Sequence, residues 1–367
     1  MKKIALLGST GSIGVQVLNA VRRHPNSFKI VAMSAYGESK AFIQQVKEFK
    51  PELYAIASKN KEAALEVACY AGADIVFNAV SGFAGLEYSV KAIKAGKNLA
   101  LANKETLVCG GDFITRLAKA HGVEIIPVDS EHSAIWQCLN FEREASFKKL
   151  ILTASGGPFR GYTQEQLEKV TPQQALNHPT WRMGKKITVD SATLLNKGYE
   201  VIEAHELYGA PYSKIETVIQ PTSVVHSLVE FADGAVMAQM GSPDMQVPVQ
   251  LALTYPKHMS TAAQPLSFKK ALTVEFIPLV RKQYPLYDLA LNCGKEGGTL
   301  PCALNAADEV AVKAFLDEKI KFTDIYRAVE HVLSTTERDE LVSYKQLEEV
   351  DRTARWKAQK FIYKLSK

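Results

Sequence analysis

The first 128 residues alternate short apolar runs with segments whose apolar side chains recur at helical spacing. The apolar runs predict strands at residues 3–7, 28–34, 53–57, 74–80, 97–101 and 123–128. Helical spacing occurs between them at residues 13–23, 61–71, 86–95 and 112–120. Repeated strand–helix units of this kind build a parallel sheet with helices on both faces. We therefore expect an α/β domain over residues 1–128.

This regular alternation stops after residue 145. Strands are expected at residues 149–154, 215–220, 224–231 and 235–240, with Asp233-Gly234 as a hairpin turn between the last two. They predict a second, α+β domain over residues 129–255, whose sheet is antiparallel or mixed. Open edges of such a sheet suit dimerisation. Within this region residues 161–186 are polar and proline-punctuated, so Trp181 and Met183 either pack on the core or belong to a mobile loop, about 177–185, that closes over a ligand.

Residues 187–205 have helical spacing, with Asp190 or Ser191 as the expected N-cap. Four polar residues share one face of this helix: Asn196, Lys197, Glu200 and Glu203. That face is either a solvated salt-bridge face or a functional one. Gly198 beside it would let another backbone or a ligand come close.

The last third of the chain is expected to be helical. Residues 256–285 are irregular and read as a linker, and helices are predicted at residues 303–316, 322–333 and 344–365. They would form a C-terminal α-helical bundle within a domain of residues 286–367. Asn305 and Glu309, near the start of this helical region, could reach the functional site, but capping and packing roles fit them equally well.

The first strand–helix turn carries three glycines in the pattern Gly8-x-x-Gly11-x-x-Gly14. After a strand and before a helix, this pattern is typical of a Rossmann-like dinucleotide site, where the helix N-terminus faces the pyrophosphate. An NAD site needs an acid at the end of the second strand. Here the strand itself has no acid, and Ser34, Ser39 and Lys40 suit the 2′-phosphate of NADP better, although Glu38 weakens this argument.

Polar residues gather after the fifth and sixth predicted strands, at one edge of the parallel sheet. Asn103, Lys104 and Glu105 follow the fifth strand, and Asp129 and Glu131 follow the sixth. Taken alone, these groups also fit a surface ion pair and a helix cap. With Glu200 and Glu203, however, they supply carboxylate ligands that suit Mg²⁺ or Mn²⁺ better than zinc.

A second polar set has the chemistry of a phosphate site. It comprises hydroxyls, an amide, an ammonium and an imidazole, supplied by Ser155, Ser191, Asn196, Lys197 and His178. A divalent cation beside a nicotinamide would polarise the oxygens of a hydroxy-ketone. The residues therefore point to reduction of a phosphorylated, sugar-like carbonyl compound.

Composition and charge exclude several other classes of protein. A net charge of +5 over 44 basic and 39 acidic residues is too weak for a nucleic-acid interface. The five cysteines are scattered and odd in number, which favours reduced thiols over disulfides or zinc. No apolar run approaches the 18 residues of a membrane span. We expect a cytoplasmic globular protein that binds neither nucleic acid nor membrane and has no targeting segment before the first strand.

Eight motifs in this order resemble one known family. They are Gly8-Ser-Thr-Gly-Ser-Ile-Gly14, Leu101-Ala-Asn-Lys-Glu105, Pro127-Val-Asp-Ser-Glu-His132, Thr153-Ala-Ser-Gly-Gly-Pro158, His178-Pro-Thr-Trp181, Val189-Asp-Ser-Ala-Thr193, Asn196-Lys-Gly198 with Glu200, and Ala303-Leu-Asn-Ala-Ala307. Together they resemble the 1-deoxy-D-xylulose 5-phosphate reductoisomerases of the non-mevalonate (MEP) isoprenoid pathway. The resemblance covers essentially the whole chain.

The resemblance implies a homodimeric enzyme that uses NADPH and Mg²⁺ or Mn²⁺, with Co²⁺ a further candidate. It would rearrange 1-deoxy-D-xylulose 5-phosphate by a retro-aldol/aldol route and reduce the product to 2-C-methyl-D-erythritol 4-phosphate. The metal ligands would be Asp129, Glu131 and Glu200. The catalytic residues would be Lys104, Glu131, His178 and His226.

The resemblance also assigns binding residues. The substrate would contact Ser130, Glu131, Ser155, His178, Trp181, Met183, Ser191, Asn196, Lys197 and Glu200, and Glu203 would lie outside the metal ligands. NADPH would contact Gly8, Ser9, Thr10, Gly11, Ser12, Ile13, Ser39, Asn103, Lys104, Glu105 and Gly184. One departure concerns residues 35–39, which are not the Gly-Lys-Asn type often found at the family's 2′-phosphate site, so the 2′-phosphate contacts stay open.

Two alternatives make different predictions. Another NADP-dependent dehydrogenase, for example one acting on a semialdehyde or an amino acid, would not need the separated carboxylates and would stay active in EDTA. A non-catalytic nucleotide sensor would bind NADPH without turnover and would leave the three carboxylates Asp129, Glu131 and Glu200 unexplained.

Overall fold

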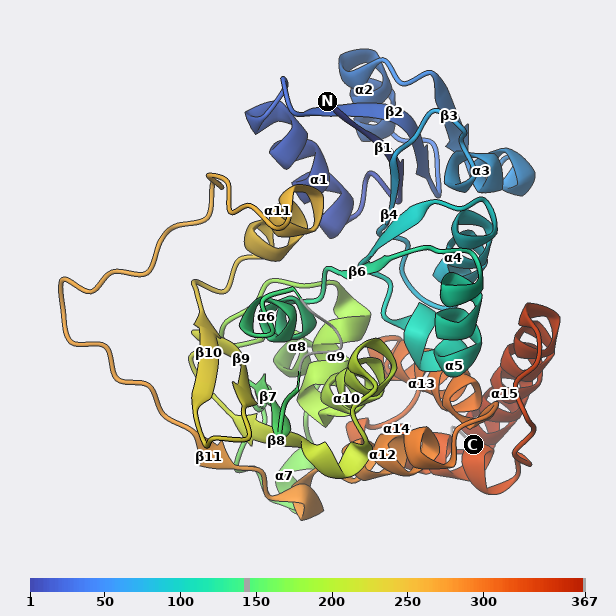
Figure 1. Ribbon diagram of the computed structural model, residues 1–367. Helices are drawn as coiled ribbons and strands as arrows, with labels where there is room; N and C mark the ends of the chain where they lie inside the picture. Colours follow the sequence, from blue (N-terminus) through green and yellow to red (C-terminus); the bar gives the residue numbers. More distant parts are fainter. Residues whose placement is uncertain (142–145, 366–367) are drawn as a thin grey trace. The chain divides into compact units, whose positions relative to one another are not determined.

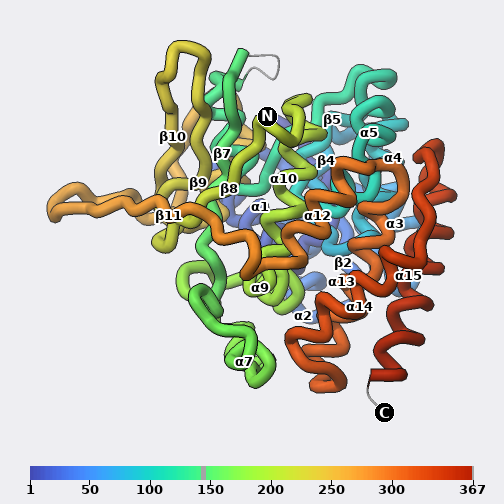
Figure 2. The backbone as a smooth tube through the Cα atoms, turned by 90° about the horizontal axis from the view of Figure 1, so that it is seen from below, coloured from blue at the N-terminus to red at the C-terminus, as the bar shows by residue number. Residues whose placement is uncertain are grey.

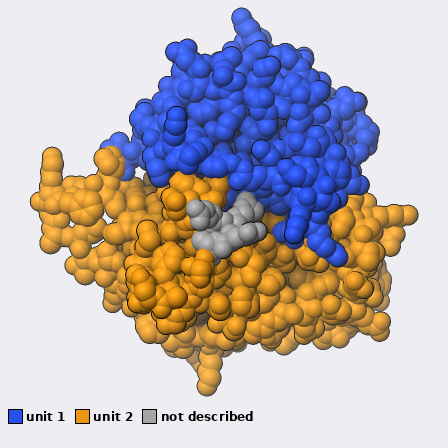
Figure 3. All heavy atoms as spheres, viewed as in Figure 1, with its two compact units in different colours: residues 1–106, 114–133, 244–264 blue, residues 107–113, 134–243, 265–367 orange. Residues whose placement is uncertain are grey.

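The structure is a computed structural model that describes residues 1–141 and 146–365. The chain divides into two units that alternate along the sequence and are coloured separately in Figure 3. The first unit contains residues 1–106, 114–133 and 244–264, and the second contains residues 107–113, 134–243 and 265–367, of which 142–145 and 366–367 lie outside the described part. The domain boundaries expected at residues 128, 255 and 285 stay predictions.

A six-stranded parallel sheet forms the centre of the first unit (Figure 1). Its strands are β1 Lys2–Leu7, β2 Phe28–Ala35, β3 Leu53–Ile56, β4 Ile75–Asn78, β5 Asn98–Leu101 and β6 Ile125–Pro127. Their order, β3-β2-β1-β4-β5-β6, reverses direction at β1, so the carboxyl ends of β1 and β4 border the position where such sheets bind dinucleotides. The predicted α/β architecture is confirmed.

Helices connect these strands because each intervening segment carries one apolar stripe. They are α1 Ser12–Arg23, α2 Lys40–Phe49, α3 Lys61–Ala68, α4 Ala84–Lys94 and α5 Glu105–Ala120. α6 Ser130–Cys138 follows β6, and α11 Gln246–Thr254 comes much later in the chain but belongs to the same unit. α5 and α6 have residues in both units. α2 and α11 were not predicted from the sequence. A signal for α2 was present, because Ser39 caps it by accepting the Phe42 N–H.

The second unit contains a mixed sheet in the order β10-β9-β7-β8-β11, whose strands β7 to β10 run side by side in Figure 2. The strands are β7 Lys149–Ala154, β8 Ile215–Ile219, β9 Val225–Glu230, β10 Val236–Met240 and β11 Ile277–Pro278. β7 and β8 pair in parallel, and the other pairs are antiparallel. The predicted α+β region is therefore confirmed.

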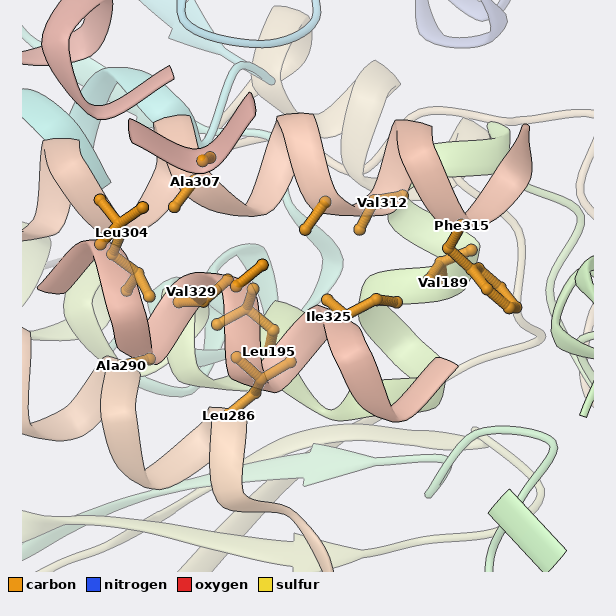
Figure 4. Close-up of a cluster of buried hydrophobic side chains, with 14 of the residues drawn as sticks. Val189, Leu195, Leu286, Ala290, Leu304, Ala307, Val312, Phe315, Ile325 and Val329 are labelled. Atoms are coloured by element: carbon orange, nitrogen blue, oxygen red, sulfur yellow. The ribbon is translucent and has the colours of Figure 1, made fainter. Parts of the chain in front are cut away.

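Helices complete the second unit. They are α7 Gln164–Leu167, α8 Pro172–Ala175, α9 Lys185–Thr193, α10 Leu195–Tyr208, the 3₁₀ turns η1 Tyr212–Lys214 and η2 Arg281–Gln283, α12 Pro285–Glu296, α13 Leu300–Leu316, α14 Phe322–Ser334 and α15 Tyr344–Leu365. Figure 4 shows their shared core, in which Leu195, Ala290, Leu304 and Val329 come from four different helices. The predicted C-terminal helices are confirmed, and α12 had not been predicted. Among the described residues, no helix is both long and apolar enough to cross a membrane.

The prediction of a single helix that starts after Asp190 or Ser191 and extends to residue 205 is wrong. The structure has two helices, α9 and α10, separated by Leu194 in the left-handed conformation at φ 62°. Asp190 and Ser191 lie inside α9, so neither is an N-cap. A bulky residue at positive φ has no sequence signal, because glycine or asparagine would be expected there.

The region expected to be an irregular linker, residues 256–285, is only partly irregular. Residues 255–276 contain no helix or strand, but Ile277 then pairs with Ile219 in the sheet and α12 begins at Pro285. Asn305 and Glu309 have packing roles: the Asn305 amide donates to Glu309, and Arg355 of α15 forms an ion pair with the same carboxylate at 2.6 Å.

The Glu206 carboxyl of α10 lies where α5 is kinked at Gly111, in the second unit. A Cβ at Gly111, whose φ is +34°, would come within 2.9 Å of Glu206 Oε1. Burial, and secondarily the nearby Asp112 carboxylate, raises the pKa of Glu206 to about 7. The folded protein therefore holds this group protonated in a pH range where the unfolded chain ionises it.

Glu206→Gln is expected to stabilise the protein at pH 8 but not near pH 4. The pKa of Glu206 is higher in the folded protein than in the unfolded chain, so its neutral form contributes to the stability of the wild type. This contribution is complete below pH 4.5 and is lost as the pH rises through about 7. The variant removes that loss, so its free energy of unfolding should exceed that of the wild type by about 1–3 kcal/mol at pH 8. Urea unfolding at both pH values measures this, and an equal difference at the two pH values would contradict it.

Candidate functional site

The glycine turn after β1 has the close backbone approaches that its sequence pattern predicts. Gly8 has φ +77°, and a Cβ on Gly14 would lie 2.2 Å from the Gly8 carbonyl oxygen. At Gly11, the N-cap of α1, a Cβ would lie 3.3 Å from that oxygen. Ser9 is fully buried: its hydroxyl donates to Gln45, its N–H donates to the Ser34 carbonyl, and its carbonyl accepts the Gln45 amide. Glycine residues in this turn leave room for a phosphate group to approach the backbone N–H groups.

The residues after β5 are largely engaged with one another. The Asn103 amide donates to Glu105 Oε2 and to the carbonyls of Val80 and Gly82, and Asn103 Oδ1 accepts the Thr106 N–H. Lys104 Nζ lies 3.0 Å from Asp129 Oδ2. The structure thus brings Lys104 and Asp129, two of the candidate site residues, into direct contact at the carboxyl edge of the sheet.

The segment after β6 is both a helix start and a cluster of ligand-type groups. The Asp129 carbonyl accepts the Ser133 N–H at the first turn of α6, and its carboxylate accepts the Ser130 N–H. The Ser130 hydroxyl donates to Glu131, and His132 Nδ1 lies 3.8 Å from Asp129 Oδ2. The capping role considered for Asp129 is real, and it leaves the carboxylate of Asp129 beside Lys104.

In the second unit, two serines from distant segments meet at a glycine turn. Gly157, at φ +68°, follows β7, and a Cβ there would lie 2.7 Å from the Ser191 carbonyl oxygen at the end of α9. Ser155 and Ser191 then both reach His178, with their Oγ atoms 3.0 Å from its Nε2. The two glycines of this turn belong to the motif Thr153–Pro158, but the packing of α9 on them was not predicted from the sequence.

His178 is held in one orientation by its own loop. Its Nδ1 accepts the backbone N–H groups of Thr180 and Trp181 at 3.2 and 3.0 Å. An accepting Nδ1 carries no proton, so this network assigns the proton of the neutral ring to Nε2, which faces the two serines. Burial lowers the pKa of His178, which favours that neutral form.

The polar face of α10 is buried, so its interpretation as a solvated face is wrong. Lys197, Glu200 and Glu203 are 3, 1 and 3% exposed. The side chains of Asn196 and Lys197 both donate to the Glu200 carboxylate. The close approach predicted at Gly198 is made by α12, since a Cβ there would lie 2.5 Å from the Ala290 Cβ. The helix is thus packed tightly behind its charged residues.

The remaining loop candidates have fewer contacts. The Trp181 ring lies 6.0 Å from that of His226, centroid to centroid, and Gly184 is the N-cap of α9. Thr180, which had not been singled out, shares a 2.9 Å hydrogen bond with Ser223. These contacts place the loop residues 178–181 against the β8–β9 turn.

A buried charge cluster behind α9 was also missed. Lys186 Nζ lies 2.7 Å from Asp190 and 2.6 Å from Asp308 of α13, and burial raises the pKa of the Asp308 carboxyl. The same ammonium lies 5.0 Å from the Tyr199 ring. Nothing in the sequence spacing connects residues 186 and 308, so no sequence signal could have found this pair.

The donor groups fit a divalent cation and a dinucleotide. The expected metal ligands offer carboxylate oxygens, the donors that Mg²⁺ and Mn²⁺ prefer. Asp129 and Glu131 belong to the first unit and Glu200 to the second. In the first unit, Gly14 lets α1 pack closely on the Gly8-Ser9 backbone, and Gly11 has no side chain where the N-terminus of α1 would face a pyrophosphate.

Comparison with known proteins identifies the family. Models described as 1-deoxy-D-xylulose 5-phosphate reductoisomerase match residues 4–69 and 59–111, and models of its C-terminal domains match residues 125–208 and 240–357. The reductoisomerase of Chlorobaculum tepidum is 45% identical over 99% of this chain and its own full length. That of Geobacillus kaustophilus is 47% identical over 95% of this chain and 96% of its own.

Solved structures of reductoisomerases have the same fold. One in complex with NADPH, fosmidomycin and magnesium has a TM-score of 0.92 at 36% identity, covering 100% of both chains. The enzyme from Zymomonas mobilis in complex with NADPH has a TM-score of 0.90 at 37% identity, covering 98% of this chain and 99% of its own. The chain belongs to the 1-deoxy-D-xylulose 5-phosphate reductoisomerase family.

Proposed function

We propose that this protein converts 1-deoxy-D-xylulose 5-phosphate into 2-C-methyl-D-erythritol 4-phosphate, with NADPH and a divalent cation. The observation that carries the proposal is the buried Glu200 carboxylate, which accepts hydrogen bonds from Asn196 and Lys197. All three residues lie on α10, the helix that follows α9, and α9 carries Ser191, which contacts His178. In this proposal, consecutive helices supply phosphate-binding groups and a metal ligand. Relatives solved with NADPH, fosmidomycin and magnesium support the same cofactors.

The phosphate of the substrate is assigned to Ser155, Ser191, Asn196 and Lys197. Hydroxyl and amide groups donate hydrogen bonds to phosphate oxygens, and the ammonium offsets their charge. His178 Nε2 lies between the two serines and carries the proton of the neutral ring, so it adds a further donor. Trp181 and Met183 of the loop would then cover the substrate and exclude water.

The reacting end of the substrate is assigned to the carboxylate groups. Asp129, Glu131 and Glu200 would hold the cation, which when bound polarises the carbonyl and hydroxyl oxygens as a Lewis acid. Lys104 orients Asp129 by its direct contact, and Ser130 would bind a substrate hydroxyl. His226 would line the site beside Trp181. The nicotinamide would lie at the edge formed by Asn103, Lys104 and Glu105, and Gly184 would contact it from the loop.

Following NADPH absorbance tests this proposal. NADPH should be oxidised only when 1-deoxy-D-xylulose 5-phosphate is present together with one of the cations Mg²⁺, Mn²⁺ or Co²⁺. EDTA should stop the reaction. Activity that persists in EDTA would indicate a metal-independent dehydrogenase instead. NADPH binding without turnover at any metal concentration would indicate a nucleotide-binding protein.

We also propose that the protein is a homodimer, as expected from the resemblance. β10 is an edge strand of its sheet, and its side chains Val236 and Met237 are 52 and 51% exposed. An apolar sheet edge of this kind favours pairing with a second chain. Sedimentation should therefore give twice the 40.4 kDa mass of one chain. The cytoplasmic location stays a prediction.

A further inference from the structure

The carboxyl ends of β2 and β3 meet in an ion pair that neither the glycine pattern nor the family motifs include. Glu38 follows β2, Lys59 follows β3, and the Lys59 ammonium contacts the Glu38 carboxylate. Both side chains are about half exposed, at 49 and 60%. In dinucleotide-binding sheets, the residues after the second strand lie at the adenosine ribose of the cofactor. The pair therefore stands where NAD and NADP are distinguished.

The backbone fixes Lys59 in this position. β3 pairs in parallel with β2, and the pairing extends beyond the strands, because Ala57 N–H donates to Ala35 and Ser58 N–H donates to Tyr36. The Lys59 N–H then bonds the Ile56 carbonyl at 3.0 Å, and Asn60 caps α3. This connected turn places Lys59 next to the segment that follows β2, within reach of Glu38.

The charges at this edge favour a phosphate over a hydroxyl. Glu38 alone would accept a hydrogen bond from the ribose 2′-OH of NAD and would repel the 2′-phosphate of NADP. Residues 36–40 and 57–60 together carry two lysines, Lys40 and Lys59, against this one glutamate. With Lys59 bound to it, Glu38 is neutralised as an acceptor. A phosphate oxygen arriving beside the pair then meets an ammonium group that can bridge it to Glu38.

We propose that Lys59 is the cation that binds the 2′-phosphate of NADPH, with Glu38 as its partner when no cofactor is bound. This inference rests on the proposed use of NADPH and adds to it the residue that selects NADPH over NADH. Residues 35–39, at and after the end of the second strand, contain no lysine, so the nearest cations are Lys40 and Lys59. Ser39 adds its hydroxyl, which accepts the Phe42 N–H and keeps its own hydrogen for donation.

Fluorescence titration of the protein with NADPH and with NADH, without substrate, tests the proposal. Lys59→Met should weaken NADPH binding about tenfold, the effect of one hydrogen bond between charged groups. NADH binding should stay unchanged or become tighter, because Glu38 without Lys59 can accept a hydrogen bond from the ribose 2′-OH. Lys59→Arg should retain NADPH binding, and Glu38→Gln should tighten it by freeing Lys59. Added salt should weaken NADPH binding more in the wild type than in Lys59→Met.

The matched control is Lys61→Met, because Lys61 is an exposed lysine two residues later whose ammonium pairs with Glu87 at 2.6 Å. It should bind both cofactors like the wild type. Equal loss of NADPH and NADH affinity in Lys59→Met, or unchanged NADPH affinity, would overturn the assignment of Lys59. Weaker NADH binding in Glu38→Gln would show that Glu38 is a ribose ligand instead. If the wild type binds NADPH no more tightly than NADH, the proposed NADPH dependence itself fails.

Discussion

Glu200→Gln should abolish turnover while NADPH affinity stays at the wild-type value. Glutamine keeps the size of the side chain but removes the negative charge that a divalent cation requires of its ligand. The loss of cation binding should lower kcat by about a thousandfold or more, as expected when the charge that stabilises a transition state is removed. Lys197 also loses its ion-pair partner, so the KM for the phosphorylated substrate should change as well.

Steady-state kinetics at saturating Mg²⁺, combined with NADPH titration, measures both effects. The control is Glu206→Gln, because Glu206 lies on the same helix but faces the α5 kink and is outside the candidate site. Its kcat should match that of the wild type. A Glu200→Gln variant that keeps about a tenth of the wild-type kcat would contradict the metal-ligand assignment, and loss of NADPH binding would contradict the division between the metal and cofactor sites.

Gly14→Ala should destabilise the first unit and remove NADPH binding. The new Cβ would lie 2.2 Å from the Gly8 carbonyl oxygen and 2.7 Å from the Ser9 Cα, and both contacts are with backbone. Backbone atoms cannot move aside without shifting the turn that faces the pyrophosphate. The cost should be about 3 kcal/mol or more, at the upper end of overpacking effects.

Thermal unfolding and NADPH titration together check this result. Gly37→Ala is the control for stability, because a Cβ at Gly37 meets no atom within 4 Å and its φ is not positive. Its unfolding temperature should match that of the wild type. A Gly14→Ala variant that binds NADPH normally would show that α1 can move away from the turn, and the assigned role of Gly14 would then be wrong.

The parallel sheet could be predicted from sequence because its strands are short, almost continuously buried runs. In β1 and β4, for example, the residues Ile4–Leu7 and Ile75–Asn78 are buried without interruption. Such runs are characteristic of sheets covered on both faces. The glycine turn could be predicted as well, because its three glycines are required by local steric constraints and their spacing is visible in the sequence.

The break between α9 and α10 could not be predicted, because a leucine at position 194 gives no sign of positive φ. Two backbone contacts stabilise it: the Leu194 N–H bonds the Ser191 carbonyl, and the Leu195 N–H bonds Thr193 Oγ1. The break lies between Ser191 and the pair Asn196 and Lys197, because α9 ends at Thr193 and α10 begins at Leu195. The break therefore determines where several candidate site residues lie, although the sequence gives no indication of it.

The chemistry of the candidate residues was more predictable than their burial. The residue types after β6 and on α10 indicated carboxylate and phosphate chemistry, but helical spacing alone could not distinguish a solvated face from a buried one. α12 packs against Gly198 of the same helix, a contact between residues about ninety positions apart in the chain. Long-range contacts of this kind are absent from local patterns.

The carbon skeleton of the reaction product tests the proposed function most directly. ¹³C-labelled 1-deoxy-D-xylulose 5-phosphate would be incubated with NADPH, Mg²⁺ and the wild-type protein, and the product analysed by ¹³C NMR. The proposed function predicts the branched 2-C-methyl-D-erythritol 4-phosphate, formed in equal amount to the NADPH consumed. An unbranched pentitol phosphate would show reduction without rearrangement and would contradict the proposed function.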